Sequence, residues 1–351
     1  MILLGGCLKK DSTFRIVFRA DGGNEIGLGH IVRCISLIQI LREEFECVLF
    51  CYRPSDALKK LVEPWCKVFE LQRQTSGGEV DEIADSLRKT DILVLDGYNF
   101  TLEYQFEVSK HVKSIVSIDD ISSQDFYVDV IINHGSVQHL KSYRSKPGTR
   151  IFSGFPFLIA RREFLKAAER PRKITQVDTI FICMGGSDPF SITPKVLQAS
   201  IECEFITNII VVTGALNKEE RVLERMIHSN QEKNIKHVVN ADAVTMVELI
   251  NQSQIALTTA SSVALEICCV KSALICGTVI ENQSAIHQQL VGSNCCKSVG
   301  DWKSVGVNAI KQLISSFRDS EEVNRIMGLQ HSCIDGKSGK RIFTIFKELA
   351  A

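Results

Sequence analysis

The chain has 351 residues, of which 45% are hydrophobic and 23% are charged, a composition typical of folded globular proteins that excludes disordered and fibrous chains. Its 41 basic residues balance 41 acidic residues, so no net charge attracts the protein to nucleic acid or to an anionic membrane surface. The apolar stretches stay below the ~18 residues that a membrane-spanning helix needs. We therefore expect neither a nucleic-acid partner nor a membrane partner.

Cysteine is abundant, with 13 residues, but no CxxC pair and no zinc-ligand spacing occurs. A disulfide framework is not expected in a chain large enough to form its own core, and a reducing cytoplasm fits this usage. The adjacent pairs Cys268-Cys269 and Cys295-Cys296 stand in apolar segments, which favours buried, small hydrophobic side chains. We predict no metal site and no cofactor, and we interpret residues 1–13 as an N-terminal extension.

From Phe14 onward, short aliphatic and β-branched runs alternate with amphipathic segments, a pattern that predicts βαβ units around parallel sheets. The first series of expected strands covers residues 14–20, 47–52, 67–71, 91–96, 114–119 and 128–133. The second series covers residues 177–184, 208–213, 236–239, 254–258, 272–277 and 295–299. The sequence therefore predicts an α/β protein with two Rossmann-like, doubly wound domains of six strands each.

The expected connection between these domains begins at Gly154 and ends at Lys173, where glycine, proline and a dense run of charge come together. We place the domain boundary near residue 170. The first domain is then expected over residues 14–170 and the second over residues 171–351.

Unusual residues follow the expected strands, at the sheet edge where ligands of open parallel sheets bind. In the first half they occupy positions 21–30, 96–99, 119–120 and 133–134, and in the second half positions 185–188, 213–214, 260–262 and 281–283. We predict that these two edges face each other across an interdomain cleft.

Gly27-Leu28-Gly29-His30 leads directly into an amphipathic stretch, so its glycines can let the backbone approach a ligand at a helix N-terminus. It is not a dinucleotide fingerprint, because Val32 stands where the third glycine would be. His30 lies in the first helical turn, whose positive end would disfavour the imidazolium and keep a neutral base available. The alternative is a histidine that merely caps the helix.

Ser261 and Ser262 occupy the expected N-terminus of another helix, with Glu266 one turn further along. A diphosphate could accept from the backbone N–H groups and the hydroxyls there, while Glu266 accepts from a ribose diol. The alternative is a serine cap followed by a solvated glutamate.

Two further turns suit the same ligand. Gly185-Gly186-Ser187-Asp188 follows a strongly apolar strand and is equally compatible with a phosphate-binding loop and with an ordinary capped turn. Asn282-Gln283 begins another expected helix and could hydrogen-bond an oxygen-rich ligand.

The pair Asp119-Asp120 is a weak metal candidate, since adjacent carboxylates on an extended segment point to opposite sides. His134 and His139 have no carboxylate or thiolate at ligand spacing, and we expect them to have surface or core roles.

Taken together, an ordered set of blocks resembles the UDP-2,4-diacetamido-2,4,6-trideoxy-β-L-altropyranose hydrolases of pseudaminic acid biosynthesis. The blocks lie between about Phe14 and Gly292. They comprise residues 18–21, 26–30, 33–34, 95–98, 118–120, 129–133, 154–155, 161, 163–164, 181–188, 261–262 and 266.

The resemblance implies a GT-B-like pair of domains that hydrolyses a UDP-sugar at its anomeric carbon with inversion, releasing UDP and a free 2,4-diacetamido-2,4,6-trideoxyhexose. It implies that His30 is the general base, assisted by Asp21 and Tyr98. The implied substrate-binding residues are Gly27, Gly29, Asn133, Arg161, Gly185, Gly186, Ser261, Ser262, Glu266, Asn282 and Gln283. The main alternative is an inverting GT-B glycosyltransferase with a UDP-sugar donor. A nucleotide-sugar-binding protein without catalysis is a third possibility.

Overall fold

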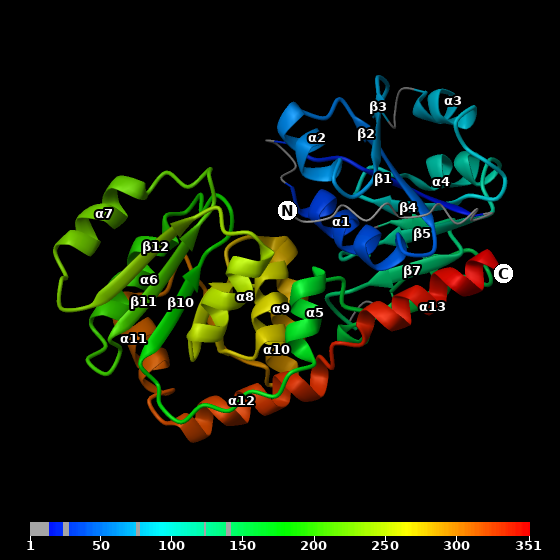
Figure 1. The fold of residues 1–351 in the computed structure, drawn as a ribbon. Helices are drawn as coiled ribbons and strands as arrows, with labels where there is room; N and C mark the ends of the chain where they lie inside the picture. The colour runs from blue at the N-terminus through cyan, green and yellow to red at the C-terminus, as the bar shows by residue number, and fades with distance from the viewer. Residues whose placement is uncertain (1–13, 24–27, 75–77, 123, 138–141) are drawn as a thin grey trace, which may run out of the picture. The chain divides into compact units, whose positions relative to one another are not determined.

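The computed structural model describes residues 14–23, 28–74, 78–122, 124–137 and 142–351. These residues form two compact units (Figure 1). The first comprises residues 14–134, 142–159 and 339–351, and the second comprises residues 135–137 and 160–338, each without the gaps named above. No helix in this described part is both long and apolar enough to span a membrane.

In its described residues, the first unit has a parallel sheet of seven strands in the order β3-β2-β1-β4-β5-β7-β9. The strands are β1 (Arg15–Ala20), β2 (Glu46–Tyr52), β3 (Lys67–Leu71), β4 (Ile92–Asp96), β5 (Ser114–Ile118), β7 (Val130–Asn133) and β9 (Arg150–Ser153). Two short strands, β6 (Asp125–Phe126) and β8 (Arg144–Ser145), pair apart from it. The six strands expected from the sequence are all present. The sequence did not predict β9, because its four residues are only half-buried and begin with an arginine.

Side-chain alternation along the strands builds one core on each face of this sheet. Ile16 and Phe18 of β1 face a core shared with α1 (Gly29–Leu41), α2 (Asp56–Val62) and α13 (Ser338–Ala350). Val17, between them, faces the opposite core, shared with α3 (Glu79–Ala84) and α4 (Leu102–Ser109). A period of two along each strand is what a sheet covered by helices on both faces requires.

The domain limits differ from the predicted ones at both ends of the second domain. The chain enters the second unit at Ala160, ten residues before the predicted boundary near 170. Helix α13 belongs to the first unit, because Ile342, Ile345 and Phe346 complete the core beside α1. A sequence divided by composition cannot reveal such a return, since an amphipathic helix carries no mark of the core that it covers.

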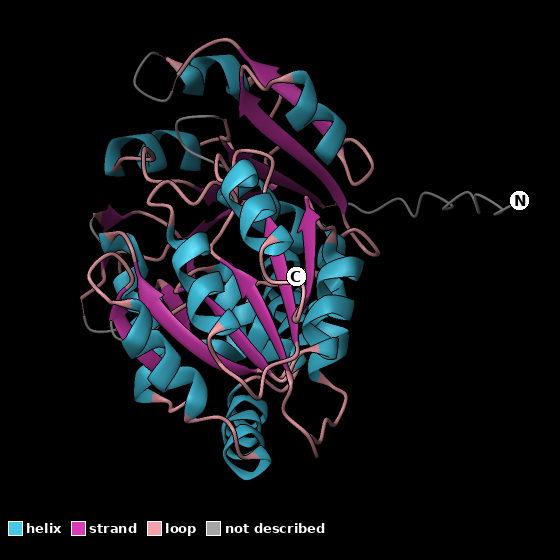
Figure 2. Ribbon diagram, turned by 90° about the vertical axis from the view of Figure 1, so that its left-hand side faces the viewer, coloured by secondary structure: helices cyan, strands magenta, loops and turns pink. Residues whose placement is uncertain are grey.

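In its described residues, the second unit has a parallel sheet of six strands in the order β12-β11-β10-β13-β14-β15. The strands are β10 (Thr179–Cys183), β11 (Asn208–Thr213), β12 (Asn234–Val239), β13 (Ile255–Thr259), β14 (Ala273–Thr278) and β15 (Cys296–Asp301). Helices, cyan in Figure 2, precede, connect and follow the strands of this sheet. They are α5 (Arg162–Ala168), α6 (Ile192–Ile201), α7 (Glu220–His228), α8 (Ala243–Gln252), α9 (Ser262–Val270), α10 (Ser284–Gly292), α11 (Val307–Ser315) and α12 (Ser320–Cys333). All six expected strands are confirmed.

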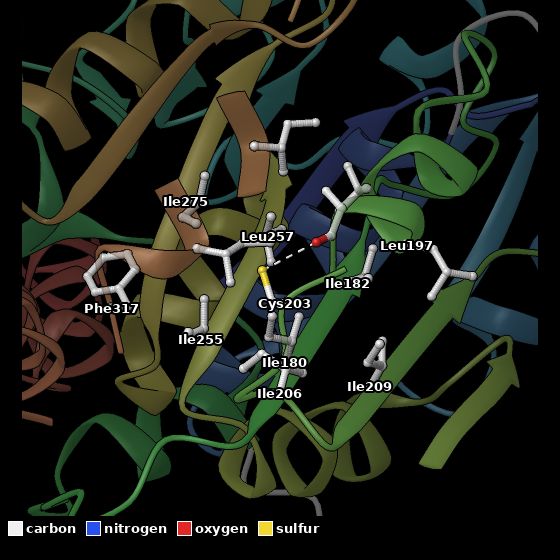
Figure 3. Close-up of a cluster of buried hydrophobic side chains, with 14 of the residues drawn as sticks. Ile180, Ile182, Leu197, Cys203, Ile206, Ile209, Ile255, Leu257, Ile275 and Phe317 are labelled. Carbon is white, nitrogen blue, oxygen red and sulfur yellow. Dashed lines mark hydrogen bonds between the residues drawn. The ribbon is translucent and has the colours of Figure 1, made fainter. Parts of the chain in front are cut away.

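The core of the second unit is mainly aliphatic, as Figure 3 shows. Ile180, Ile182 and Leu257 project from neighbouring strands toward Leu197 of α6 and toward Phe317. The cysteine pairs at 268–269 and 295–296 are buried free thiols, as predicted, and burial raises the pKa of each of them.

Both sheets reverse their strand order at an equivalent place, between β1 and β4 in the first unit and between β10 and β13 in the second. Beyond the carboxyl ends of such a strand pair, the two connections diverge to opposite faces of the sheet and leave a crevice. The two positions therefore locate the residues that can contact a ligand.

Candidate active site

His30 lies in the first turn of α1, directly after this crevice, and only 8% of its surface is exposed. Its Nδ1 is 2.7 Å from Oδ1 of Asp96, the last residue of β4. Burial opposes ionisation of Asp96, but the charge and hydrogen bonds of Arg33 and the bond from His30 together lower the Asp96 pKa to about 2. An ionised carboxylate can only accept, so Nδ1 carries a proton, and in the neutral ring the lone pair is then on Nε2. His30 therefore does not merely cap the helix.

Arg33, one turn further along α1, holds the Asp96 carboxylate from the other side. Its Nε donates to Asp96 Oδ2 at 2.8 Å and its Nη1 donates to Asp120 Oδ2 at 3.0 Å. Nη1 also lies 3.2 Å from Nε2 of His134, which must accept because a guanidinium has only donors. Burial, and then the Arg33 charge, lower the His134 pKa to about 4, which agrees with a neutral ring.

A pocket of about 120 Å³ opens beside His30 and brings together the three residues predicted to be catalytic. The Tyr98 and His30 rings form a T-shaped contact with 5.0 Å between centroids, and the Tyr98 hydroxyl donates to Asp120 at 3.0 Å. Asp21 follows β1 on the other side. The pocket is lined by Asp21, His30, Asp96, Gly97, Tyr98, Asn99 and Phe100.

Asp21 is held by buried charge behind it. Its Oδ1 accepts from the Arg19 guanidinium and, at 2.9 Å, from the backbone N–H of Tyr52. Arg19 in turn donates to both oxygens of Glu79, at 2.7 and 2.6 Å, and Glu79 accepts from Tyr104. With Arg19 shared between two carboxylates, Asp21 is fixed at the pocket rim.

Asp119 and Asp120 serve different partners, as expected for neighbours on an extended segment. Asp120 faces Arg33, whereas Asp119 accepts from Tyr143 at 2.6 Å. Asn133 is fully buried and donates to Tyr143 at 3.0 Å, so its side chain ties the loops together and does not line the pocket. His134, expected on a surface or in a core, lies buried in the charged cluster.

Two glycines at the start of α1 were predicted to bind the substrate. Gly29 is the first residue of α1, where an added Cβ would meet nothing within 4 Å, and it does not line the pocket. Gly27 lies outside the described residues.

In the second unit, the turn after β10 leaves its backbone open. A Cβ on Gly185, whose φ is +96°, or on Gly186 would meet nothing within 4 Å. The following Asp188 accepts from the backbone N–H groups of Ile192 and Thr193, so this residue caps α6. The turn is therefore a capped turn with two accessible glycines in front of it, and its role in binding phosphate stays a prediction.

The turn after the neighbouring strand β13 carries the serines. Ser261 is the N-cap of α9 and uses no side-chain bond to cap it; its hydroxyl donates to the Thr259 carbonyl at 3.4 Å, and the N–H of Ala264 donates to the Ser261 carbonyl. Backbone N–H groups at such a helix start can bind an anion. Because β10 and β13 pair in parallel, with Cys183 beside Thr258, this turn adjoins the glycine turn. The predicted phosphate-binding elements therefore come together within the second unit.

Glu266 is 6% exposed, and its two oxygens accept from Nε and Nη2 of Arg161 at 2.8 and 2.9 Å. Burial raises the Glu266 pKa, while Arg161 acts in the opposite direction. A solvated glutamate is therefore excluded. Of the remaining pair, Gln283 accepts from the backbone N–H of Val279 at 2.8 Å, and Asn282 is exposed.

Asp96 and Arg33 stand in segments that the sequence singled out, but neither was predicted as a site residue. A usable signal existed, because Asp96 ends a strand that is otherwise entirely apolar and Arg33 stands three residues after His30 on the same helix face.

No family model matches the chain. The chain is 27% identical to the protein MJ1062 of Methanocaldococcus jannaschii over 257 residues, which make up 70% of this chain. The chain spans about half (51%) of the length of that protein. It is 25% identical over 341 residues to the spore coat polysaccharide biosynthesis protein SpsG of Bacillus subtilis, with 94% and 97% of the two chains covered.

A third relative confirms the resemblance found in the sequence. The UDP-2,4-diacetamido-2,4,6-trideoxy-β-L-altropyranose hydrolase of Campylobacter jejuni is 24% identical over 279 residues, which cover 77% of this chain and 94% of that enzyme.

Solved structures agree on the fold. MurG of Acinetobacter baumannii matches with a TM-score of 0.67 at 10% identity over 95% of this chain and 99% of its own. The calicheamicin glycosyltransferase CalG4 matches with a TM-score of 0.64 at 9% identity over 95% and 98%. The chain therefore has the GT-B fold of two Rossmann-like domains, and its sequence resembles that of a UDP-sugar hydrolase.

Proposed function

We propose that this protein hydrolyses a UDP-linked 2,4-diacetamido-2,4,6-trideoxyhexose at its anomeric carbon, with inversion, and so supplies free sugar for pseudaminic (nonulosonic) acid biosynthesis. The observation that carries the proposal is the buried His30–Asp96 pair beside a pocket that Asp21 and Tyr98 also line. The Campylobacter jejuni relative carries this activity in its name.

His30 is the proposed base for water. Asp96 accepts a hydrogen bond from Nδ1–H, so Nε2 of the neutral ring can take a proton from a water molecule whose oxygen attacks the anomeric carbon. As the bond from that carbon to the phosphate oxygen breaks, its electron pair leaves with UDP. The ionised Asp96 stabilises the imidazolium that forms, in the manner of the aspartate in a catalytic triad.

The second unit is proposed to bind the leaving group. A nucleoside diphosphate departs more readily than the alkoxide that glycosidases must protonate, so no paired acid is needed. Backbone N–H groups at Gly185-Gly186 and at the α9 N-terminus would stabilise its growing negative charge.

Glu266 would accept from the ribose diol. Although Arg161 donates to both of its oxygens, each carboxylate oxygen has two lone pairs, so acceptor capacity remains. Arg161 then has a positioning role behind Glu266, and Asn282 and Gln283 would contact the sugar or phosphate. The proposal requires the carboxyl edges of the two units to come together around one UDP-sugar.

An inverting glycosyltransferase is the second candidate, favoured by the fold shared with MurG and CalG4. Such an enzyme would use the same base but would place an acceptor hydroxyl where water attacks in a hydrolase.

The two candidates are separated by incubating the protein with UDP-activated deoxyamino sugars in ¹⁸O-labelled water. We expect UDP release without an acceptor and label in the free sugar, and NMR of the fresh product should show the inverted anomer. Release only after an acceptor is added would establish transfer. Binding of the UDP-sugar without release would exclude both enzymatic functions.

A further inference from the structure

Arg33 is the one cation within hydrogen-bond distance of the Asp96 carboxylate among the described residues, and its guanidinium contacts four side chains. Nε and Nη2 bind the two oxygens of Asp96, and Nη1 reaches Asp120 and His134. Nη2 also lies 3.1 Å from His30 Nδ1. Since Nδ1–H donates its hydrogen bond to Asp96, Nδ1 cannot accept one from Arg33. The Arg33 guanidinium is therefore a cation in contact with the ring that becomes a cation when it accepts a proton.

The charges of this cluster do not balance. Asp96 and Asp120 contribute two negative charges, because the pKa of each is lowered despite burial, and Arg33 contributes one positive charge. The cluster therefore has a net charge of −1 while His30 is neutral, and it becomes neutral when His30 accepts a proton. Without Arg33, two buried carboxylates would attract that proton and hold it.

We propose that Arg33 is a positioning residue for the His30 base: it fixes the Asp96 carboxylate with one oxygen toward Nδ1, and its charge keeps the neighbouring carboxylates from holding His30 in the protonated form. The assignment rests on the proposed function, in which the neutral ring is the working form. Arg33 does not line the pocket, so it acts through Asp96 and His30.

Several other charged or titratable groups face this site. Around His30 they are Asp96 of β4, Arg33 of α1, Tyr98 after β4, and Asp21 after β1, which lines the same pocket. Around Asp96 and Arg33 they also include the thiol of Cys34, Asp120 after β5, and His134 after β7. Burial raises the pKa of Cys34 and of Tyr98, and burial lowers that of His134, so these three stay uncharged near neutral pH.

The test uses charge-matched variants and two readouts, the NMR titration of the His30 ring and the pH profile of kcat/KM for UDP-sugar hydrolysis. Arg33→Gln changes the cluster from −1 to −2, and Asp120→Asn changes it to zero. We expect the midpoint of the His30 titration to rise by about one pH unit in the first variant and to fall by a similar amount in the second, as for a nearby charge. The acid limb of the pH profile should move in the same directions.

The double variant Arg33→Gln/Asp120→Asn restores the net charge of −1 and should return the midpoint to the wild-type value. It also answers the case in which Arg33→Gln does not fold, because it leaves only one buried carboxylate. Arg33→Lys keeps the charge but cannot hold both oxygens of Asp96, so it should keep the midpoint while kcat falls. Arg42→Gln, at the exposed end of the same helix, is the control and should change neither quantity.

Equal midpoints in the wild type, Asp120→Asn and the double variant would overturn the assignment of Arg33, even if hydrolysis is confirmed. Conversely, wild-type turnover by His30→Asn would refute the base and leave the titration shifts as a separate result. The two failures are therefore distinguishable.

Discussion

The two units share a strand order and place their conspicuous residues at the same point of the sheet, yet the two edges are built from different materials. In the first unit, buried side chains bond one another, with Arg33, Asp96 and His30 in direct contact. In the second unit, nothing lies within 4 Å of the Cβ positions of Gly185 and Gly186, and the N-cap Ser261 makes no side-chain bond to its helix.

This difference shows that the fold fixes the place of a site while the residue types fix its task. A buried cluster that is short of one positive charge is suited to receiving a proton. An open glycine turn beside a helix N-terminus without a side-chain cap bond is suited to binding an anion. Changes in the first unit should therefore alter the rate, and changes in the second should alter nucleotide affinity.

The sharpest way to break this division is His30→Asn. We expect kcat to fall by a factor of ~10²–10⁴, the usual contribution of a general base, because asparagine cannot accept the proton. The affinity for UDP, measured by calorimetry, should stay unchanged. His111→Gln, which lies outside the cluster, serves as the control. A His30→Asn enzyme with weak UDP binding and a normal rate would reverse the roles of the two units.

Glycine contacts sharpen the comparison within the second unit. A Cβ on Gly214 would overlap the carbonyl oxygen of Gly186, so Gly214→Ala should lower the free energy of unfolding by about 2 kcal/mol, as overpacking does. Gly186→Ala has open space and should leave stability unchanged, but its methyl group would hinder a diphosphate.

Unfolding of this unit can be followed in urea by Trp302 fluorescence in a Trp65→Phe background, since Trp302 is buried in its core. Equal stability losses in Gly214→Ala and Gly186→Ala would show that the open turn is not what distinguishes the two glycines.

Glu266→Gln examines nucleotide binding with a smaller expected effect. The amide keeps the shape of the side chain but loses the charge, so UDP affinity should weaken about tenfold, the loss expected for a charge-assisted hydrogen bond. The rate at saturating substrate should change little. Glu248→Gln, exposed on α8 of the same unit, is the matched control. Unchanged affinity in Glu266→Gln would remove Glu266 from the nucleotide site.

Most of the fold could be predicted from the sequence, because the buried strands of both sheets are short apolar runs that stand out along the chain. All twelve expected strands exist, whereas β9, half-buried and partly polar, carried no such signal. The position of α13 could not be predicted either, since Ile342 and Phe346 pack with Ile16 and Phe18, which lie more than 320 positions away in the chain.

The site was accessible only in part. Asp21, His30 and Tyr98 follow strands that the sequence located, and the pocket brings them together. The Arg161–Glu266 pair joins residues 105 positions apart, and the bonds of Arg33 to Asp96 and His134 cross three strands of the sheet. Such pairings depend on side-chain geometry after folding, which residue spacing does not encode.

The smallest expected effect concerns stability in the first unit. Burial and Arg33 lower the His134 pKa from its ordinary 6.5 to about 4, so the folded chain keeps this ring neutral where the unfolded chain protonates it. Between these two values the unfolded state binds more protons, and the free energy of unfolding must fall as the pH is lowered. Lowering the pH from 7.5 to 5.5 should cost about 1 kcal/mol through His134, by the standard conversion of a pKa difference.

His134→Gln should remove this part of the pH dependence, because its amide does not titrate, whereas His111→Gln should retain it. The pH dependence of both variants is measured by urea unfolding followed by Trp65 fluorescence. A Trp302→Phe background removes the fluorescence of the second unit, so the signal reports on the first unit alone. If the free energy of unfolding of His134→Gln depended on pH as strongly as that of the wild type, His134 would not be held neutral by Arg33 and burial. The charge cluster would then need a partner other than this ring, and the contrast between a titratable first edge and a backbone-built second edge would rest on His30 and Asp96 alone.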